Sequence, residues 1–266
     1  AAAAALGARK GAVVALDPRN GEVLAMVSVP TYDPGALGTL GEQLLKDPDS
    51  PLLNRATQGR YPPGSTFKTV TAISVLENGV YKPTDTVACP GELVFDGFPV
   101  SCRNVPQGVG TYPFKNAYTF SVNAIFAQAG VKLGWDRLLT TASRLGFGKA
   151  LDFTLETAPT QVHDPGATLD TALLASTAFG QGQLLATPLQ MVVVAAAVAN
   201  GGVLARPHLG LAALDGDRVV EHVQRHVTAE VLARLRVQSV RARFRQHDRQ
   251  HHAADGHGGD QDQVQL

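Results

Sequence analysis

Two apolar stretches of strand length open the recognisable pattern of the chain. Gly11–Leu16 and Glu22–Val29 are rich in β-branched and apolar residues. Residues 17–21 between them read Asp-Pro-Arg-Asn-Gly, and Asn-Gly accepts the positive φ angles that tight hairpin turns require. The pattern predicts a β-hairpin over residues 11–29.

Helical periodicity dominates the middle of the chain. Residues 65–77 are apolar around most of the helix circumference and are followed by Asn78-Gly79, a typical helix terminator. Because such a helix belongs inside a domain, the polar residues Ser65 and Lys68 in its first turn need an explanation. Further helices are predicted at residues 123–133, 136–145 and 187–199, the last with Thr187 as N-cap and Pro188 at its first position.

The remaining segments are irregular or short. Residues 30–63 are rich in Pro, Gly and Asp, and they predict a long excursion with one short helix near residues 41–46. Residues 80–117 predict short strands and loops. Strands at one end of the chain and helices through its middle predict an α+β fold.

The composition changes near residue 236. Residues 241–266 are mostly Gln, His, Arg, Asp and Gly, with no apolar period. Such a segment cannot bury a core. We therefore expect one domain over residues 1–235 and a low-complexity tail over residues 236–266, which is disordered or read out of frame.

Composition excludes several classes of protein. The 266 residues include 23 basic and 23 acidic side chains, and 44% of the chain is apolar. A balanced charge argues against a nucleic-acid surface, and the apolar fraction argues against general disorder. No run reaches the roughly 18–20 apolar residues of a membrane span. The chain begins with Ala, and residues 1–5 do not resemble a signal peptide, so we expect a partial product whose membrane anchor lies upstream.

The tetrapeptide Ser65-Thr66-Phe67-Lys68 places a hydroxyl and an amine on one helix face, one turn apart. Burial lowers the pKa of a lysine, and a neutral amine beside a serine is a general base that makes the hydroxyl nucleophilic. The helix N-terminus offers N–H groups to a developing oxyanion. The alternative is a solvated Ser and Lys at a helix start.

A second polar pair, Ser121 and Asn123, lies just before a predicted helix. A short loop there can direct both side chains into one cleft, where Ser121 relays a proton and Asn123 donates to a carbonyl. The alternative is that Ser121 only caps the helix.

Together these two motifs match S-x-x-K followed by S-x-N, the signature of penicillin-binding proteins and serine β-lactamases. Several other segments resemble the class B enzymes in particular: residues 11–18 and 21–28, 53–56 leading into 61–68, 180–182, 187–190 and 199–202. The chain is identified as a member of the class B penicillin-binding proteins, with the transpeptidase domain running from about residue 11 to about residue 235.

This resemblance implies an antiparallel sheet with a helical subdomain and a peptidoglycan D,D-transpeptidase that uses no cofactor or metal. By resemblance, Ser65 attacks the penultimate D-Ala carbonyl of a stem peptide, with its N–H as half of the oxyanion hole. Lys68 is the base, Ser121 the proton relay and Asn123 the contact for the donor-strand amide. The amine of a second stem peptide then resolves the acyl-enzyme, and β-lactams acylate the same serine. The implied location is the extracytoplasmic face of the bacterial cell membrane, among cell-wall synthesis partners.

The chain departs from the family at its third motif. No K-T-G or K-S-G occurs in the 266 residues. In the family, that strand supplies a cation for the substrate carboxylate and the second oxyanion donor, and losing one such donor typically costs about 10²–10³ in rate. The sequence therefore predicts that the C-terminal sheet strands are missing, which leaves enzymatic activity open.

Three alternatives follow. The chain is a truncated or degenerate non-catalytic homologue, or a D,D-carboxypeptidase or β-lactamase in which water replaces the acceptor amine.

Cys89 and Cys102 are compatible with one disulfide or with free thiols. The tail histidines include an i,i+4 pair, His247 and His251, but a low-complexity tail is a poor candidate for a metal site.

The abrupt loss of apolar periodicity near residue 236 leads to the hypothesis that the tail is not a native continuation, because a reading-frame error or a truncated gene would produce such a change. Resequencing the gene is expected to recover a K-T-G in another frame, within or beyond the codons of the tail. If no frame encodes this motif, the frame-error hypothesis fails and a divergent homologue replaces it.

Overall fold

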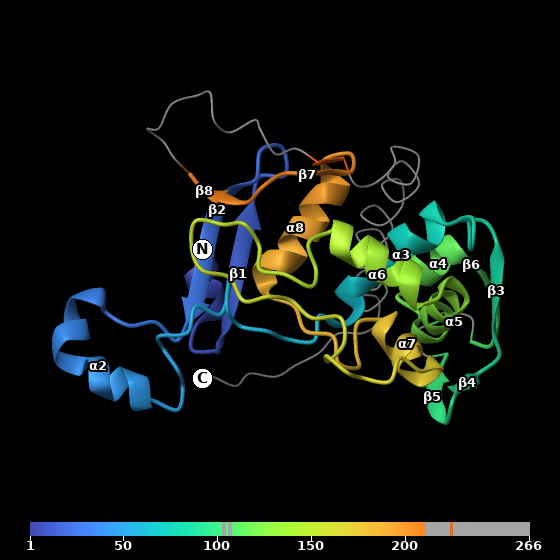
Figure 1. Cartoon of the computed structure of the whole chain (residues 1–266), viewed down its shortest axis with the longest axis horizontal. Coiled ribbons are helices and arrows are strands. Elements are labelled where there is room, and N and C mark those ends of the chain that lie inside the picture. Colours follow the sequence, from blue (N-terminus) through green and yellow to red (C-terminus); the bar gives the residue numbers. More distant parts are fainter. Residues whose placement is uncertain (103–104, 106–107, 211–223, 226–266) are drawn as a thin grey trace, which may run out of the picture.

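A computed structural model describes residues 1–102, 105, 108–210 and 224–225 of the chain. The α-helices are α1 (Ala2–Leu6), α2 (Leu37–Lys46), α3 (Lys68–Glu77), α4 (Phe114–Thr119), α5 (Asn123–Leu133), α6 (Trp135–Arg144), α7 (Thr171–Thr177) and α8 (Pro188–Ala199), with 3₁₀ turns η1 (Pro34–Ala36) and η2 (Gly64–Phe67). The strands are β1 (Gly11–Leu16), β2 (Glu22–Val29), β3 (Thr86–Cys89), β4 (Glu92–Phe95), β5 (Phe98–Ser101), β6 (Gly110–Pro113), β7 (Val203–Leu204), β8 (His208–Leu209) and β9 (Gln224–Arg225). Figure 1 shows the β1–β2 hairpin and α8 on one side of a helical region built around α3 and α5.

The predicted hairpin is present with the predicted bounds. β1 and β2 pair antiparallel from Gly11 opposite Val29, and the turn closes when the Asp17 N–H donates to the Glu22 carbonyl over 2.8 Å. Gly21 has φ 88°, and a Cβ there would lie 2.1 Å from the Arg206 carbonyl oxygen, so only glycine fits. A short third strand, β8, pairs parallel with the outer edge of β2. α8 packs against β1 and so gives the ribbon the apolar support that an isolated hairpin lacks.

Helix α3 forms the centre of the helical region. It packs against α5 and α6, and its residues 70–75 are all buried, as its apolar circumference predicts. The predicted helix over residues 65–77 begins differently from expectation, because residues 64–67 form a 3₁₀ turn and the α-helix starts at Lys68. The tighter turn changes the first-turn geometry but keeps Ser65 and Lys68 together.

The other predicted helices are close to the observed ones. α5 has the predicted bounds, and α8 begins at Pro188 with the Thr187 hydroxyl accepting from the Gln190 N–H over 3.1 Å, as predicted. α6 is shifted by one residue from the prediction, and the short helix expected near residues 41–46 extends back to Leu37 as α2. No residue of α2 is buried, and Figure 1 shows this helix standing apart from the sheet.

Some elements were not predicted. α1, α4 and α7 are helices of five to seven residues, too short to show a full period of 3.6 over several turns. α7 is nevertheless capped, because the Asp170 carboxylate accepts from the Leu173 N–H over 2.7 Å. α1 and α4 have no side-chain cap, so the local signal for a helix start is present in α7 alone of these three.

Short strands form the far end of the helical region. β3 pairs with β6, and β4 pairs with β5, both antiparallel. A disulfide joins Cys89 at the end of β3 to Cys102 just after β5, which resolves the alternative that the sequence left open. It encloses the β4–β5 hairpin in a covalent loop.

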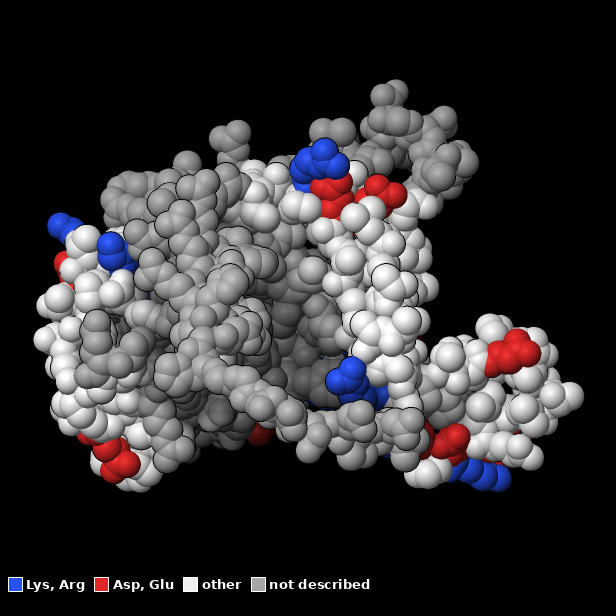
Figure 2. Space-filling view, turned by 180° about the vertical axis from the view of Figure 1, so that it is seen from behind, with Lys and Arg blue, Asp and Glu red and all other residues white. Residues whose placement is uncertain are grey.

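Two further observations concern membrane-spanning helices and the distribution of surface charge. Within the described ranges, no helix is long and apolar enough to cross a membrane. On the face seen in Figure 2, the charged side chains lie in small separate groups of both signs. The expected division between residues 1–235 and the tail over residues 236–266 falls outside the described residues.

The disulfide is expected to stabilise the fold by restricting the unfolded chain. A closed loop of this size, with a sequence separation of 13, corresponds to about 3 kcal/mol of unfolding free energy in the chain-entropy account. Guanidinium denaturation of the oxidised and the reduced protein measures the difference with every side chain retained. Equal midpoints in the two states would contradict the prediction.

Candidate active site

The 3₁₀ turn η2 presents Ser65 at the surface and directs Lys68 inward. Ser65 is exposed, whereas Lys68, three residues later, is only 1% exposed. The Thr66 hydroxyl donates to the Pro63 carbonyl over 2.6 Å and ties the turn to the Pro-Pro-Gly segment before it. The N–H groups at the start of such a turn have no acceptor inside the turn, so the Ser65 N–H can donate to a bound anion.

All four predicted site residues meet at the Lys68 amine. Lys68 Nζ lies 2.9 Å from Ser65 Oγ, 2.9 Å from Ser121 Oγ and 2.5 Å from Asn123 Oδ1. It also lies 2.8 Å from the Ser121 carbonyl oxygen, a contact that the sequence did not indicate. Residues more than 50 positions apart in the sequence thus surround one nitrogen.

The number of protons on this nitrogen limits what the cluster can do. A neutral amine has two N–H donors and one lone pair. The Ser121 carbonyl and Asn123 Oδ1 only accept, so together they take both donors. The lone pair then remains for one hydroxyl proton, from Ser65 or from Ser121. The arrangement can accept a proton from one serine and return it through the other.

Burial changes the acidity of this amine. Desolvation lowers the pKa of Lys68 from 10.5 to about 8. No carboxylate forms an ion pair with Lys68 in the part of the chain that the structure describes. The neutral form needed for a base is therefore accessible near neutral pH.

Ser121 adopts an unusual backbone conformation. Its φ is 58°, in the left-handed region that non-glycine residues seldom occupy and that costs on the order of 1–3 kcal/mol. Its N–H donates to the Tyr118 carbonyl over 3.2 Å, and the cap position of α5 is Val122, without a side-chain cap. Capping by Ser121, the alternative interpretation, is thus not observed. The turn directs both oxygens of Ser121 at Lys68.

A further segment holds the turn that carries Ser65. The Gly64 N–H donates to the Gly180 carbonyl over 2.9 Å, and the Thr71 hydroxyl donates to the Ala178 carbonyl over 2.8 Å. Gly180 has φ 90°, and a Cβ there would lie 1.7 Å from the Gly64 carbonyl oxygen. The sequence quoted Gly180 only as part of a family-like segment, because the contact depends on tertiary structure.

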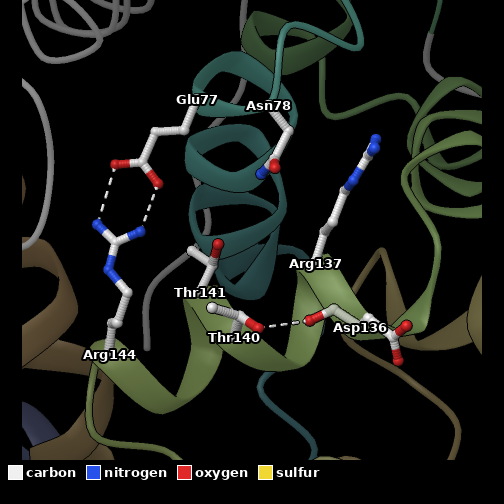
Figure 3. A pocket seen from close by; sticks show the side chains of 7 residues that line it. All are labelled: Glu77, Asn78, Asp136, Arg137, Thr140, Thr141 and Arg144. Carbon is white, nitrogen blue, oxygen red and sulfur yellow. Dashed lines mark hydrogen bonds and ion pairs between the residues drawn. The ribbon is translucent and has the colours of Figure 1, made fainter.

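A depression lies at the C-terminal end of α3, against α6 (Figure 3). Its volume is about 490 Å³, and all of its lining residues are polar: Glu77, Asn78, Asp136, Arg137, Thr140, Thr141 and Arg144. The Glu77 carboxylate accepts two bonds from Arg144 over 3.0 and 3.2 Å, and the Ser74 hydroxyl donates to the Arg137 carbonyl over 3.0 Å. These bonds join α3 to α6, so this region supports the helix that carries Lys68.

No group of three or more potential metal ligands occurs among the described residues. The tail histidines considered in the sequence, His247, His251, His252 and His257, lie outside those residues.

Comparison with known proteins gives a consistent result. The family model described as the penicillin binding protein transpeptidase domain matches residues 11–258. The chain is 38% identical over 213 residues to the peptidoglycan D,D-transpeptidase PbpA of Mycolicibacterium smegmatis, covering 75% of this chain and 43% of that protein. It is 34% identical over 238 residues to MrdA of Escherichia coli K12, covering 83% and 37%. The chain thus spans less than half the length of these relatives.

Solved structures show the same similarity. The penicillin G acyl-enzyme complex of penicillin-binding protein A from M. tuberculosis has a TM-score of 0.73 and 33% identity, covering 84% of this chain and 55% of that one. Pseudomonas aeruginosa PBP2 in complex with WCK 5153 has a TM-score of 0.75 and 32% identity, covering 88% and 55%. The complex between PBP2 and MreC from Helicobacter pylori has a TM-score of 0.78 and 26% identity, covering 89% and 46%.

Substituting Gly180 by Ala is expected to slow acylation of Ser65 by a β-lactam at least tenfold, because the added methyl group displaces the Gly64 carbonyl next to the nucleophile. The matched control is Gly148→Ala. Gly148 has a similar φ of 87°, but nothing lies within 4 Å of its Cβ position. Both variants carry the cost of about 1 kcal/mol or more for a left-handed alanine, so only Gly180→Ala combines that cost with displacement of the site. The measurement is the acylation rate per folded molecule in each variant. Equal rates in the two variants would refute the role of Gly180 in positioning the turn that carries Ser65.

Proposed function

The chain belongs to class B of the penicillin-binding protein transpeptidases, and from this premise we propose that it is a serine acyltransferase that cross-links peptidoglycan stem peptides. The single observation that carries the proposal is the position of Lys68 Nζ, within 2.9 Å of the hydroxyls of both Ser65 and Ser121. A base that touches a nucleophile and a second hydroxyl can both receive and return a proton.

The first half of the proposed reaction forms an acyl-enzyme. Ser65 Oγ attacks the carbonyl carbon of the penultimate D-Ala while Lys68 accepts the hydroxyl proton. The C–N bond to the terminal D-Ala then breaks, and its nitrogen receives a proton through Ser121. Asn123, whose carbonyl oxygen faces Lys68, has its amide NH₂ available for the amide of the donor strand.

The second half reverses these roles. The amine of a second stem peptide attacks the ester carbonyl and loses a proton towards the Lys68–Ser121 pair, and Ser65 regains its proton as the ester breaks. The Ser65 N–H, at the start of the η2 turn, is proposed as one donor to the oxyanion of both tetrahedral intermediates.

Two alternatives compete with this proposal. The absence of K-T-G from the 266 residues favours a non-catalytic homologue. A D,D-carboxypeptidase or β-lactamase would form the same acyl-enzyme and release it to water. The relatives PbpA and MrdA are named peptidoglycan D,D-transpeptidases, which supports cross-linking over hydrolysis.

Cellular context is proposed from the relatives. The solved complex of Helicobacter pylori PBP2 with MreC supports assembly of this chain with a cell-wall synthesis partner. We propose that the transpeptidase domain ends near residue 235. We also propose that it lies at the extracytoplasmic face of the cell membrane, where its substrate, peptidoglycan, is found.

Incubation with a fluorescent penicillin is expected to label Ser65, with the adduct located by mass spectrometry. Labelling is expected to disappear in Ser65→Ala and to persist in Ser143→Ala, which removes an exposed hydroxyl on α6. Because Lys68 acts as a base only when neutral, the labelling rate should rise with pH and level off above its pKa of about 8.

The outcomes separate the alternatives. A folded chain that acquires no adduct is the non-catalytic homologue. Rapid loss of the adduct to water indicates a β-lactamase. A stable adduct together with transfer of a D-Ala-containing peptide to an added amine supports the transpeptidase.

A further inference from the structure

An aromatic ring faces the amine at the centre of the site. Lys68 Nζ lies 5.7 Å from the centroid of the Phe126 ring, within the range of a cation–π interaction. Phe126 is 0% exposed and follows Asn123 by three residues on α5, so the two side chains lie on the same face of that helix. One helix thus contributes both an amide oxygen and an aromatic ring to Lys68.

Two aromatic side chains of α4 contact the Phe126 ring. The ring centroids of Phe114 and Tyr118 lie 5.3 and 6.2 Å from that of Phe126. The Tyr118 hydroxyl lies 3.0 Å from Thr69 Oγ1, and Thr69 directly follows Lys68 in α3. The ring is therefore fixed relative to the backbone that carries the amine.

The groups that surround Lys68 explain why its contact with the Phe126 ring matters for the charged amine. Across the described ranges, no carboxylate or guanidinium pairs with Lys68. Around Lys68, η2 contributes the Ser65 hydroxyl, the turn before α5 contributes the hydroxyl and carbonyl of Ser121, and α5 contributes the amide oxygen of Asn123. α4 contributes the Tyr118 phenol, which is bonded to Thr69. When Lys68 carries a proton, its positive charge is faced by neutral dipoles and by the ring.

We propose that Phe126 is a positioning residue, whose ring face holds the Lys68 amine between Ser65, Ser121 and Asn123 and stabilises it while it carries the proton. The inference rests on the proposed role of Lys68 as the base. Within the described ranges, Phe126 is the aromatic ring that faces the Lys68 amine. An aliphatic side chain of similar size fills the same space without the negative π face.

The direct test is an NMR titration of Lys68 in the whole chain labelled with ¹³C-lysine, with the Lys68→Ala spectrum as assignment. Removing the ring in Phe126→Leu is expected to lower the titration midpoint of Lys68 by about half a pH unit, since a cation–π contact favours the ammonium. The matched control is Tyr112→Leu, which removes a buried ring on β6 that forms no aromatic pair with Phe126 and should leave the midpoint unchanged.

A second measurement reads the positioning itself. The pH dependence of acylation by the fluorescent penicillin should show the same lowered midpoint in Phe126→Leu, with a plateau rate several-fold below that of the parent chain. Tyr112→Leu should keep both values per folded molecule. Because the NMR titration needs no acylation, a chain that never reacts with penicillin refutes the proposed function and still tests this inference.

The proposal is overturned if the Lys68 midpoint is unchanged or raised in Phe126→Leu, or if Tyr112→Leu shifts it equally. If Phe126→Leu does not fold, Phe126→Met takes its place, because its flexible side chain fills irregular core space without a ring. The titration midpoint of Lys68 and the plateau rate of acylation are then compared between Phe126→Met and the parent chain.

Discussion

The buried amine of Lys68 is the constraint on which the site depends. Taking a lysine out of water is expensive unless its donors find acceptors or its proton leaves. The structure supplies four oxygens and lowers the pKa to about 8, with no carboxylate paired to Lys68 in the described ranges. A buried carboxylate would favour the charged form and prevent the amine from acting as a base. Neutral dipoles avoid that outcome while still fixing the position of the nitrogen.

The scaffold serves this one nitrogen from several directions. Residues 70–75 of α3 are all buried, and Lys68 in the first turn of the helix is buried with them. α6 supports the far end of α3 through Glu77 and Arg144, while the segment around Gly180 holds the turn before Ser65. The left-handed Ser121 is the strained element, and strain persists only where surrounding packing determines the conformation. The packed helices thus offset a local cost that the chemistry requires.

The sequence predicted the features that depend on local signals and missed those that depend on contacts between distant residues. The hairpin, α5 and α8 were predictable because period and turn or cap residues are local signals, and the Ser65–Lys68 pair follows from helical spacing. The convergence of Ser121 and Asn123 on Lys68 came from resemblance to a family rather than from spacing. The contacts of Gly180 with Gly64 and of Phe126 with Lys68 join residues distant in sequence, and no local pattern encodes them. Strand β8 was likewise missed, because two paired residues are too few to show alternation.

One amine between two hydroxyls raises the question of which serine becomes acylated. Both Oγ atoms lie 2.9 Å from Lys68 Nζ, so distance to the base does not distinguish them. The backbone does. The Ser121 N–H is already bonded to the Tyr118 carbonyl and cannot stabilise an oxyanion, and Ser121 is half-buried. Ser65 is exposed, and its N–H belongs to the first positions of a helical turn, which have no acceptor within the turn. Acylation at Ser65 therefore gains an oxyanion donor that acylation at Ser121 lacks, and this asymmetry supports the proposed division between nucleophile and relay.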